Sequence, residues 1–203
     1  MRVKTEAKRD AIVAAASEVF LKSGYEGASM SEIAARVGGS KATLYSYFKS
    51  KDELFVAVIN ATASKQFEPI FAALGEGTND LPTVLQRFGE STLRFLCTQP
   101  SIQMRRAILA ESGRSDIGRR FFEIGPRKGM ADLATFLEAR MDSGQLEKSD
   151  PMLASVQLLA LLECETVMPM LYGVAGDLSD ARIRLATRRA VQLFLKAYAT
   201  ASR

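Results

Sequence analysis

GGSKATLYSYFKSKDELF, residues 38–55, is the stretch that decides the fold. Its two glycines end one helix, because glycine readily takes the positive φ that a tight turn needs. Ser40 is then placed to cap the next helix, which we expect over residues 41–48. A helix that enters a DNA major groove, about 12 Å wide, must be slim and polar at its tip. Lys41, Ala42 and Thr43 meet that requirement.

The aromatic residues of this stretch predict an inner and an outer face. Leu44 and Phe48 lie four residues apart and would anchor the inner face. Tyr45 and Tyr47 lie about 200° apart on a helix, so at least one hydroxyl points outward, where it can donate to a phosphate. Lys51 begins the following helix, where its ammonium and the free N–H groups can share one phosphate.

Helical signals surround this stretch on both sides. Apolar residues from Ile12 to Phe20 recur with spacing three and four, and Gly24 is the expected end of that helix. "SMSE" (29–32) is a capping box that starts a helix over residues 30–37. "SKDE" (50–53) is a second one, which starts a helix that we expect to reach residue 74. Two short helices across a glycine turn form a helix-turn-helix pattern.

The remaining sequence predicts more helices and no strand. We expect helices over 83–98, 102–111, 116–142, 151–172 and 180–199. The third of these should break at Gly125-Pro126, and the fourth should bend at Pro169. The fold class is therefore all-α.

Charge is distributed unevenly along the chain. The net charge is +4; residues 1–51 hold nine Lys/Arg and five Asp/Glu, whereas residues 52–203 hold 18 of each. A local basic excess suggests a polyanionic partner for the first quarter, and a merely solvated face is the alternative.

The composition gives little support to an enzyme, a metal protein or a membrane protein. There is no histidine, and Cys97 and Cys164 alone cannot make a zinc site, so no metal or cofactor is expected. Glu163 and Glu165 lie about 200° apart on a helix and cannot face each other as a catalytic dyad. No apolar run is long enough to span a bilayer, and the first residues lack the apolar region of a signal peptide. Two buried, reduced thiols would fit a cytoplasmic protein.

The segment AIVAAASEVFLKSGYEGASMSEIAARVGGSKATLYSYFKSKDELF resembles the DNA-binding segment of TetR-family transcriptional regulators over about residues 9–55. The resemblance implies an all-helical homodimer with a helix-turn-helix head over residues 1–51 and an effector-binding and dimerisation body over residues 52–203. It departs from the family at Gly39, where an apolar residue is more common. That glycine could loosen the turn or let the backbone approach DNA more closely. The residues implied at the DNA are Ser29, Met30, Ser40, Lys41, Thr43, Tyr45, Tyr47 and Lys51.

The body resembles the family more weakly. RRFFEIGPRKGMADLATFLEARMDSGQLEKSDP is similar to the C-terminal domain of the AefR-like branch. These bodies diverge greatly, so the identity of a ligand does not carry over.

The last two helices carry wide apolar faces that predict a two-fold homodimer. One face can complete the core of the chain while the remainder pairs with a second copy, and such a dimer would read a palindromic operator. A wholly internal role for both faces is the alternative. The predicted interface residues are Leu158, Leu159, Leu162, Leu185, Val191, Phe194 and Leu195.

The body also holds many large, adaptable side chains that could line an apolar effector pocket. Ordinary core packing is the alternative for each one of them. Glu163, Glu165, Gln103 and Tyr172 are candidates to orient a ligand. The predicted ligand-binding residues are Phe67, Phe71, Phe88, Phe95, Met104, Phe121, Phe122, Met168 and Tyr172, with Met130 also in the set.

These features predict a ligand-responsive regulator of transcription, by family default a repressor that a small apolar effector releases from DNA. An activator with the same fold and a helical protein-interaction module are the alternatives.

Overall fold

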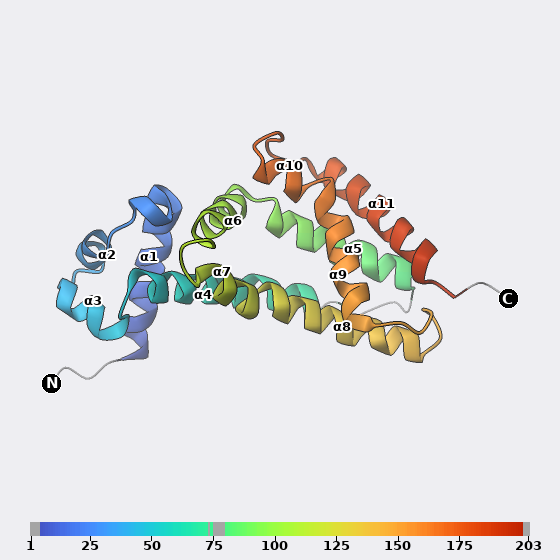
Figure 1. Cartoon of the computed structure of the whole chain (residues 1–203), viewed down its shortest axis with the longest axis horizontal. Helices are drawn as coiled ribbons and strands as arrows, with labels where there is room; N and C mark the ends of the chain where they lie inside the picture. The colour runs from blue at the N-terminus through green and yellow to red at the C-terminus, as the bar shows by residue number, and fades with distance from the viewer. Residues whose placement is uncertain (1–4, 73, 75–79, 201–203) are drawn as a thin grey trace. The chain divides into compact units, whose positions relative to one another are not determined.

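The helices account for all regular secondary structure in the described part of the chain, as the sequence predicts. The computed structural model of the chain describes residues 5–72, 74 and 80–200, and for residues 62–68 the backbone alone. No strand occurs among them beyond one isolated bridge between Leu146 and Ala199. The helices (Figure 1) are α1 (Glu6–Gly27), α2 (Met30–Arg36), α3 (Lys41–Tyr47), α4 (Lys51–Ala72), α5 (Leu81–Leu96), α6 (Gln99–Glu111), α7 (Ile117–Ile124), α8 (Pro126–Asp142), α9 (Pro151–Cys164), α10 (Val167–Leu171) and α11 (Asp180–Tyr198).

The helix starts follow the capping residues in the sequence. The Ser29 hydroxyl accepts the N–H of Glu32, and the Ser50 hydroxyl accepts the N–H of Glu53. In the second box, the Glu53 carboxylate bonds the N–H of Lys49 at 2.7 Å. These local bonds satisfy helix N–H groups that would otherwise lack partners.

Several helix ends differ from the prediction: α5 and α6 begin two and three residues earlier than expected, at Leu81 and Gln99. Gly24 does interrupt α1, with φ of 70°, but one more turn follows before the helix ends at Gly27. The helix predicted over 151–172 was wrong in one respect: α9 ends at Cys164 and α10 starts at Val167. Thr166 lies between them with φ of −126° and ψ of −79°, and its hydroxyl donates to the carbonyl of Leu162. Such bonding of a threonine to the preceding turn bends helices.

The chain packs as two units with separate cores. The head unit comprises the residues up to Ser64 together with Gln103–Gly125, and the body unit comprises Lys65–Ile102 and the residues from Pro126 on. Both α4 and α6 run along the chain from one unit into the other. The functional boundary expected after residue 51 stays a prediction.

In the head unit, α1 packs on α2 and α2 packs on α3. Its core also takes Ile108 from α6 and Ile117 from α7, both at most 3% exposed. The head predicted over residues 1–51 does not include these two residues.

In the body unit, α5 lies beside α11, and α9 packs on both α8 and α11 (Figure 1). The crossing is close: a Cβ at Gly89 of α5 would lie 2.6 Å from a methyl carbon of Thr187 on α11. Cys97 is buried, but Cys164 is exposed at the end of α9, contrary to the expectation of two buried thiols. Within the described ranges, no helix is long and apolar enough to cross a membrane, and no group of three or more potential ligands could hold a metal ion.

Candidate nucleic-acid interface

The first turn of α3 presents a short polar tip. The Ser40 hydroxyl caps the helix by accepting the N–H of Thr43 at 3.0 Å, and it lies 2.9 Å from the Thr43 hydroxyl. Lys41 and Ala42 are exposed, and Thr43 is half-buried. The cap holds the backbone of this turn, while Lys41 reaches outward, which is the arrangement that base contacts in a major groove require.

The inner face of α3 is anchored as the sequence predicts. Leu44 and Phe48 are 2% and 1% exposed. Tyr45 points outward and is 43% exposed, whereas the hydroxyl of half-buried Tyr47 accepts the backbone N–H of Thr5 at 3.1 Å. Tyr47 therefore ties the end of α3 to the start of α1, a contact that no pattern in the sequence indicates.

The start of α2 offers main-chain donors rather than a methionine side chain. Met30 is 7% exposed and its side chain lies in the head core. Because that side chain is buried, Met30 can reach DNA only through its backbone N–H. Ser29, the other residue predicted here, is exposed. The N–H groups of a first helical turn favour an anion such as a phosphate.

The turn between α2 and α3 is a Schellman motif. Gly38 takes a φ of 67°, its N–H bonds the carbonyl of Ala35, and the N–H of Gly39 bonds the carbonyl of Ala34. In this motif the residue at the place of Gly39 often makes an apolar contact with the preceding helix. A Cβ at Gly39 would meet no atom within 4 Å.

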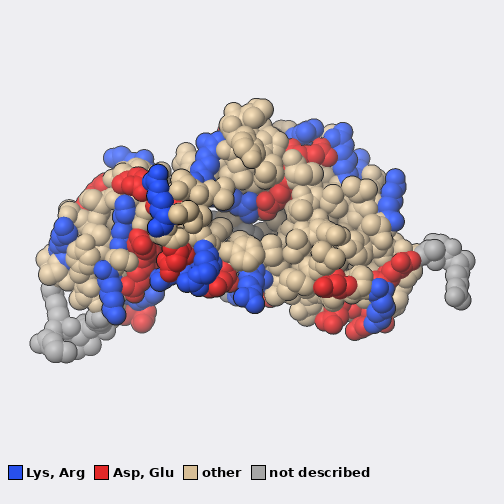
Figure 2. Space-filling model, in the orientation of Figure 1, with Lys and Arg blue, Asp and Glu red and all other residues tan. Residues whose placement is uncertain are grey.

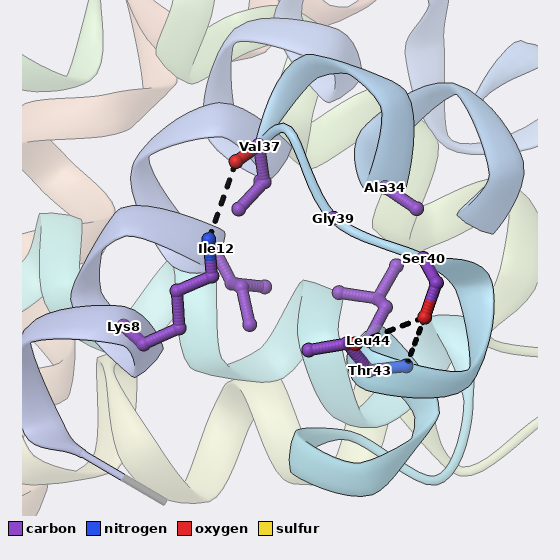
Figure 3. Close-up of a pocket in the computed structure, with 8 residues that line it drawn as sticks. All are labelled: Lys8, Ile12, Ala34, Val37, Gly39, Ser40, Thr43 and Leu44. Carbon is purple, nitrogen blue, oxygen red and sulfur yellow. Dashed lines mark hydrogen bonds between the residues drawn. The ribbon is translucent and has the colours of Figure 1, made fainter. Parts of the chain in front are cut away.

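A shallow hollow therefore lies beneath the turn (Figure 3). It is open to solvent. Figure 3 shows Ile12, Val37 and Leu44 around it, with Lys8 bonded at one side to the carbonyl of Val37 at 3.2 Å. The glycine thus leaves empty the place that an apolar side chain would occupy.

Two cations of α1 support this surface and were not predicted. The Lys8 ammonium binds the carbonyl end of α2, where the helix dipole favours positive charge. The Arg9 guanidinium lies 5.3 Å from the centre of the Phe48 ring. The only available signal in the sequence is the basic excess before residue 51.

Lys51, which we predicted to share a phosphate with the N–H groups at the start of α4, makes contacts within the protein. Its ammonium donates to the backbone carbonyls of Tyr25 at 2.8 Å and Ala28 at 3.4 Å. It also lies 4.2 Å from the centre of the Tyr25 ring. The ammonium is thus bound within the protein, at the corner between α1 and α2.

The predicted effector residues are divided between the two units. In the body unit, Phe71 and Phe88 contact each other with ring centres 5.4 Å apart. The side chain of Phe67 lies outside the described residues. The others fall into three groups: Phe95 is half-buried in the body unit, Met168 and Tyr172 are exposed there, and Met104, Phe121 and exposed Phe122 belong to the head unit.

The other candidate polar residues of that site are half-buried or exposed. Glu165 pairs with Arg189 at 2.8 Å and with Arg182 at 3.7 Å. Glu163 is half-buried, and Gln103 is exposed. Glu165 is therefore a salt-bridged residue that joins the end of α9 to α11.

Four of the predicted dimer residues are covered within a single chain. Leu158, Leu162, Val191 and Phe194 are at most 4% exposed in the core of the body unit. A partner could touch them only if that core opened, because α9 and α11 turn these side chains inward. Leu159 and Leu195 are half-buried, and Leu185 is 39% exposed.

The outer faces of the same helices carry other apolar side chains. Leu153 and Val156 of α9 are 51% and 38% exposed, and Leu193 of α11 is 54% exposed. Figure 2 shows a surface without charged residues over the middle of α9. The sequence alone does not show which face of each helix is buried, so it could not identify these residues as an exposed apolar surface.

Both parts of the chain match known families. Residues 12–58 match the family of bacterial regulatory proteins named tetR, and residues 83–200 match the C-terminal domain of AefR-like transcriptional repressors. Together these matches cover more than half of the chain.

Solved structures match over nearly the whole length. A TetR-family transcriptional regulator from Mesorhizobium loti is 28% identical with a TM-score of 0.89, and the match covers 98% of this chain and 100% of that one. The flavonoid-responsive regulator FrrA is 33% identical with a TM-score of 0.77, over 98% of this chain and all of its own.

Named regulators match over shorter stretches, and the chain spans only about a third of the length of these relatives. The transcriptional activator FasR from Mycolicibacterium smegmatis is 39% identical over 79 residues, which are 39% of this chain and 36% of that protein. The match to QacR from Staphylococcus aureus covers 30% of that protein. Members of the family bind DNA and small-molecule effectors, act as dimers and are not enzymes. The helix-turn-helix geometry and these matches together place the chain in the TetR family of DNA-binding transcriptional regulators.

Proposed function

We propose that this regulator is a repressor that a small apolar effector releases from a palindromic operator. The main support for DNA binding is the exposed first turn of α3. Ser40 caps this turn, and the buried side chains of Leu44 and Phe48 anchor the helix in the core. Lys41 and Thr43 would read base edges, and Tyr45 together with the N–H groups at the start of α2 would bind phosphates.

A palindromic operator follows from a two-fold dimer. We assign the interface to the outer faces of α9 and α11, with Leu153, Val156, Leu185 and Leu193 at its centre and half-buried Leu159 and Leu195 at its edge. Exposed apolar side chains on two adjacent helices are favourable to bury against a second copy. A pair of heads related by a two-fold axis would read half-sites about 34–36 Å apart or a multiple of that distance.

An apolar effector is supported by the aromatic content of the body. Phe71 and Phe88 already contact each other at the end of α4, and FrrA, by its name, responds to flavonoids. We propose a planar, mostly apolar compound that contacts these rings. Such a compound releases DNA only if it binds the non-DNA-binding arrangement of the dimer more tightly than the other.

The deciding experiment is a mobility-shift assay of the full chain with the DNA upstream of its own coding sequence. We expect a shifted band that a palindromic competitor abolishes and a scrambled competitor does not. Compounds that raise the thermal midpoint of the protein should then be added to the complex. Absence of binding to any fragment would reject the proposal, and binders that leave the complex intact would reject the effector part.

Activation of transcription is the second candidate, because FasR, which matches at 39% identity over 79 residues, is an activator. A reporter fused to the bound promoter distinguishes the two roles. Deletion of the regulator raises expression if it is a repressor and lowers expression if it is an activator.

A further inference from the structure

The corner between α1 and α2 is attached to the start of α4 by Lys51. Two of the three N–H bonds of its ammonium point to the carbonyls of Tyr25 and Ala28, and the Tyr25 ring lies beneath it. Hydrogen bonds from a charged donor are stronger than those between neutral groups, and a desolvated cation over an aromatic face adds to them.

A second tie joins the same two segments. The hydroxyl of Tyr25 donates to the carboxylate of Asp52, the residue after Lys51. Tyr25 is 7% exposed, and its ring packs against Phe55 of α4 with centres 4.9 Å apart. Burial and the bond to Asp52 raise the pKa of Tyr25, so the phenol remains a hydrogen-bond donor at ordinary pH.

These ties lie directly before the helix that faces DNA. Ala28, whose carbonyl accepts from Lys51, immediately precedes Ser29, the N-cap of α2. The N–H of Ala28 in turn bonds the carbonyl of Gly24. The place of the α2 N-terminus is therefore set by the first two residues of α4.

We propose that Lys51 is a positioning residue, which holds the start of α2 against α4 for DNA binding, rather than chiefly a phosphate contact. This inference rests on the proposed binding of DNA by α2 and α3. These contacts link α4 directly to α2. If Lys51 and Asp52 move, the carbonyls of Tyr25 and Ala28 and the ring of Tyr25 move with them.

The test compares Lys51→Gln with Lys49→Gln. Both remove one positive charge, but Lys49 is exposed and its side chain has no part in the corner. In the DNA-free protein we expect Lys51→Gln to speed amide exchange at Ala28, Glu32 and Ile33, whose N–H groups bond within or next to the corner. Lys49→Gln should leave these amides as in the wild type.

DNA affinity gives the second readout. Loss of hydrogen bonds to a charged group is expected to lower the affinity of Lys51→Gln about 10-fold or more. The dependence of log affinity on log salt should stay near the wild-type slope. A simple phosphate contact would instead reduce that slope by about 0.9 and leave amide exchange unchanged, and this result would overturn the proposal.

Tyr25→Phe tests the second tie separately, because it keeps the ring and both carbonyls that Lys51 contacts and removes only the buried hydroxyl that bonds Asp52. Faster exchange at Ala28 with weaker DNA binding at an unchanged salt slope supports positioning of α2 by this corner. If Lys51→Gln does not fold, Lys51→Met, which keeps the apolar stem and removes the charge, takes its place, and wild-type amide exchange in that variant overturns the proposal. If the wild type bound no DNA at all, the proposed function would fail, while the exchange measurement would still report on the Lys51 tie.

Discussion

The two glycines between α2 and α3 should respond in opposite ways to the same substitution. Gly38 has a φ of 67°, whereas Gly39 lies outside the left-handed region, and a Cβ at either position would meet no atom within 4 Å. The two sites therefore differ in backbone conformation and not in available space.

The magnitudes follow from that difference. Gly39→Ala should stabilise the protein by about 0.4–1 kcal/mol, since it restricts the unfolded chain without straining the native turn. Gly38→Ala should destabilise by about 1 kcal/mol, because a left-handed conformation costs a residue with a Cβ about 1–2 kcal/mol. Gly39→Val adds methyl groups above the hollow lined by Ala34, Val37 and Leu44. Partial burial there should bring its gain to about 1–2 kcal/mol.

The assay is thermal unfolding of the full chain, together with operator binding. For a protein of this length each kcal/mol shifts the midpoint by about 2–4 °C, so the two alanine variants should differ by several degrees. Equal destabilisation by both variants would refute the assignment of the turn. If Gly39→Ala is more stable but binds DNA more weakly, the glycine serves close backbone approach; if it binds as well or better, the glycine loosens the turn.

Three further outcomes test other parts of the molecule. Lys41→Ala should alter the preferred operator sequence by about 1–3 kcal/mol at one base pair in a competition assay, and an unchanged preference would remove Lys41 from the base-reading set. Leu193→Glu should shift the mass in solution towards the monomer because it places a charge in the proposed interface; Arg184→Glu on the same helix is the matched control, and equal dimerisation of both variants would place the interface elsewhere. A hydrogen bond to the Glu26 carboxyl and burial raise the pKa of Glu111, so the folded state holds this proton more tightly than the unfolded state. The free energy of unfolding should therefore fall as pH rises from about 4.5 through the raised pKa, and Glu111→Gln should flatten this dependence in urea titrations.

Local signals in the sequence were sufficient to locate most helices. Ser29, Ser40 and Asp150 cap as predicted, and the break at Gly125-Pro126 is confirmed. These features depend on residues within one or two turns, so a short stretch contains all of their causes. The start of α5 at Leu81 was predicted two residues late, although Asp80 is a good cap.

The direction in which each helix turns its apolar face was decided by tertiary structure. Leu158 and Phe194 lie in the core, whereas Leu153 and Leu193 lie outside, yet both sets have helical spacing. Periodicity defines a face but does not say which neighbour covers it. Met30, which the family resemblance implied at the DNA, likewise has its side chain turned into the core by the packing of the head.

The most distant contacts of the head had no signal in the sequence at all. Lys51 binds a carbonyl 26 residues earlier, and the Tyr47 hydroxyl binds an N–H 42 residues earlier. Capping residues and glycine turns by themselves determined that a helix-turn-helix would form, because their hydrogen bonds close within a few residues. Only the folded chain decided what each lysine and tyrosine of that motif would touch, because those partners are brought together by the packing of α1 and α4 around a common core.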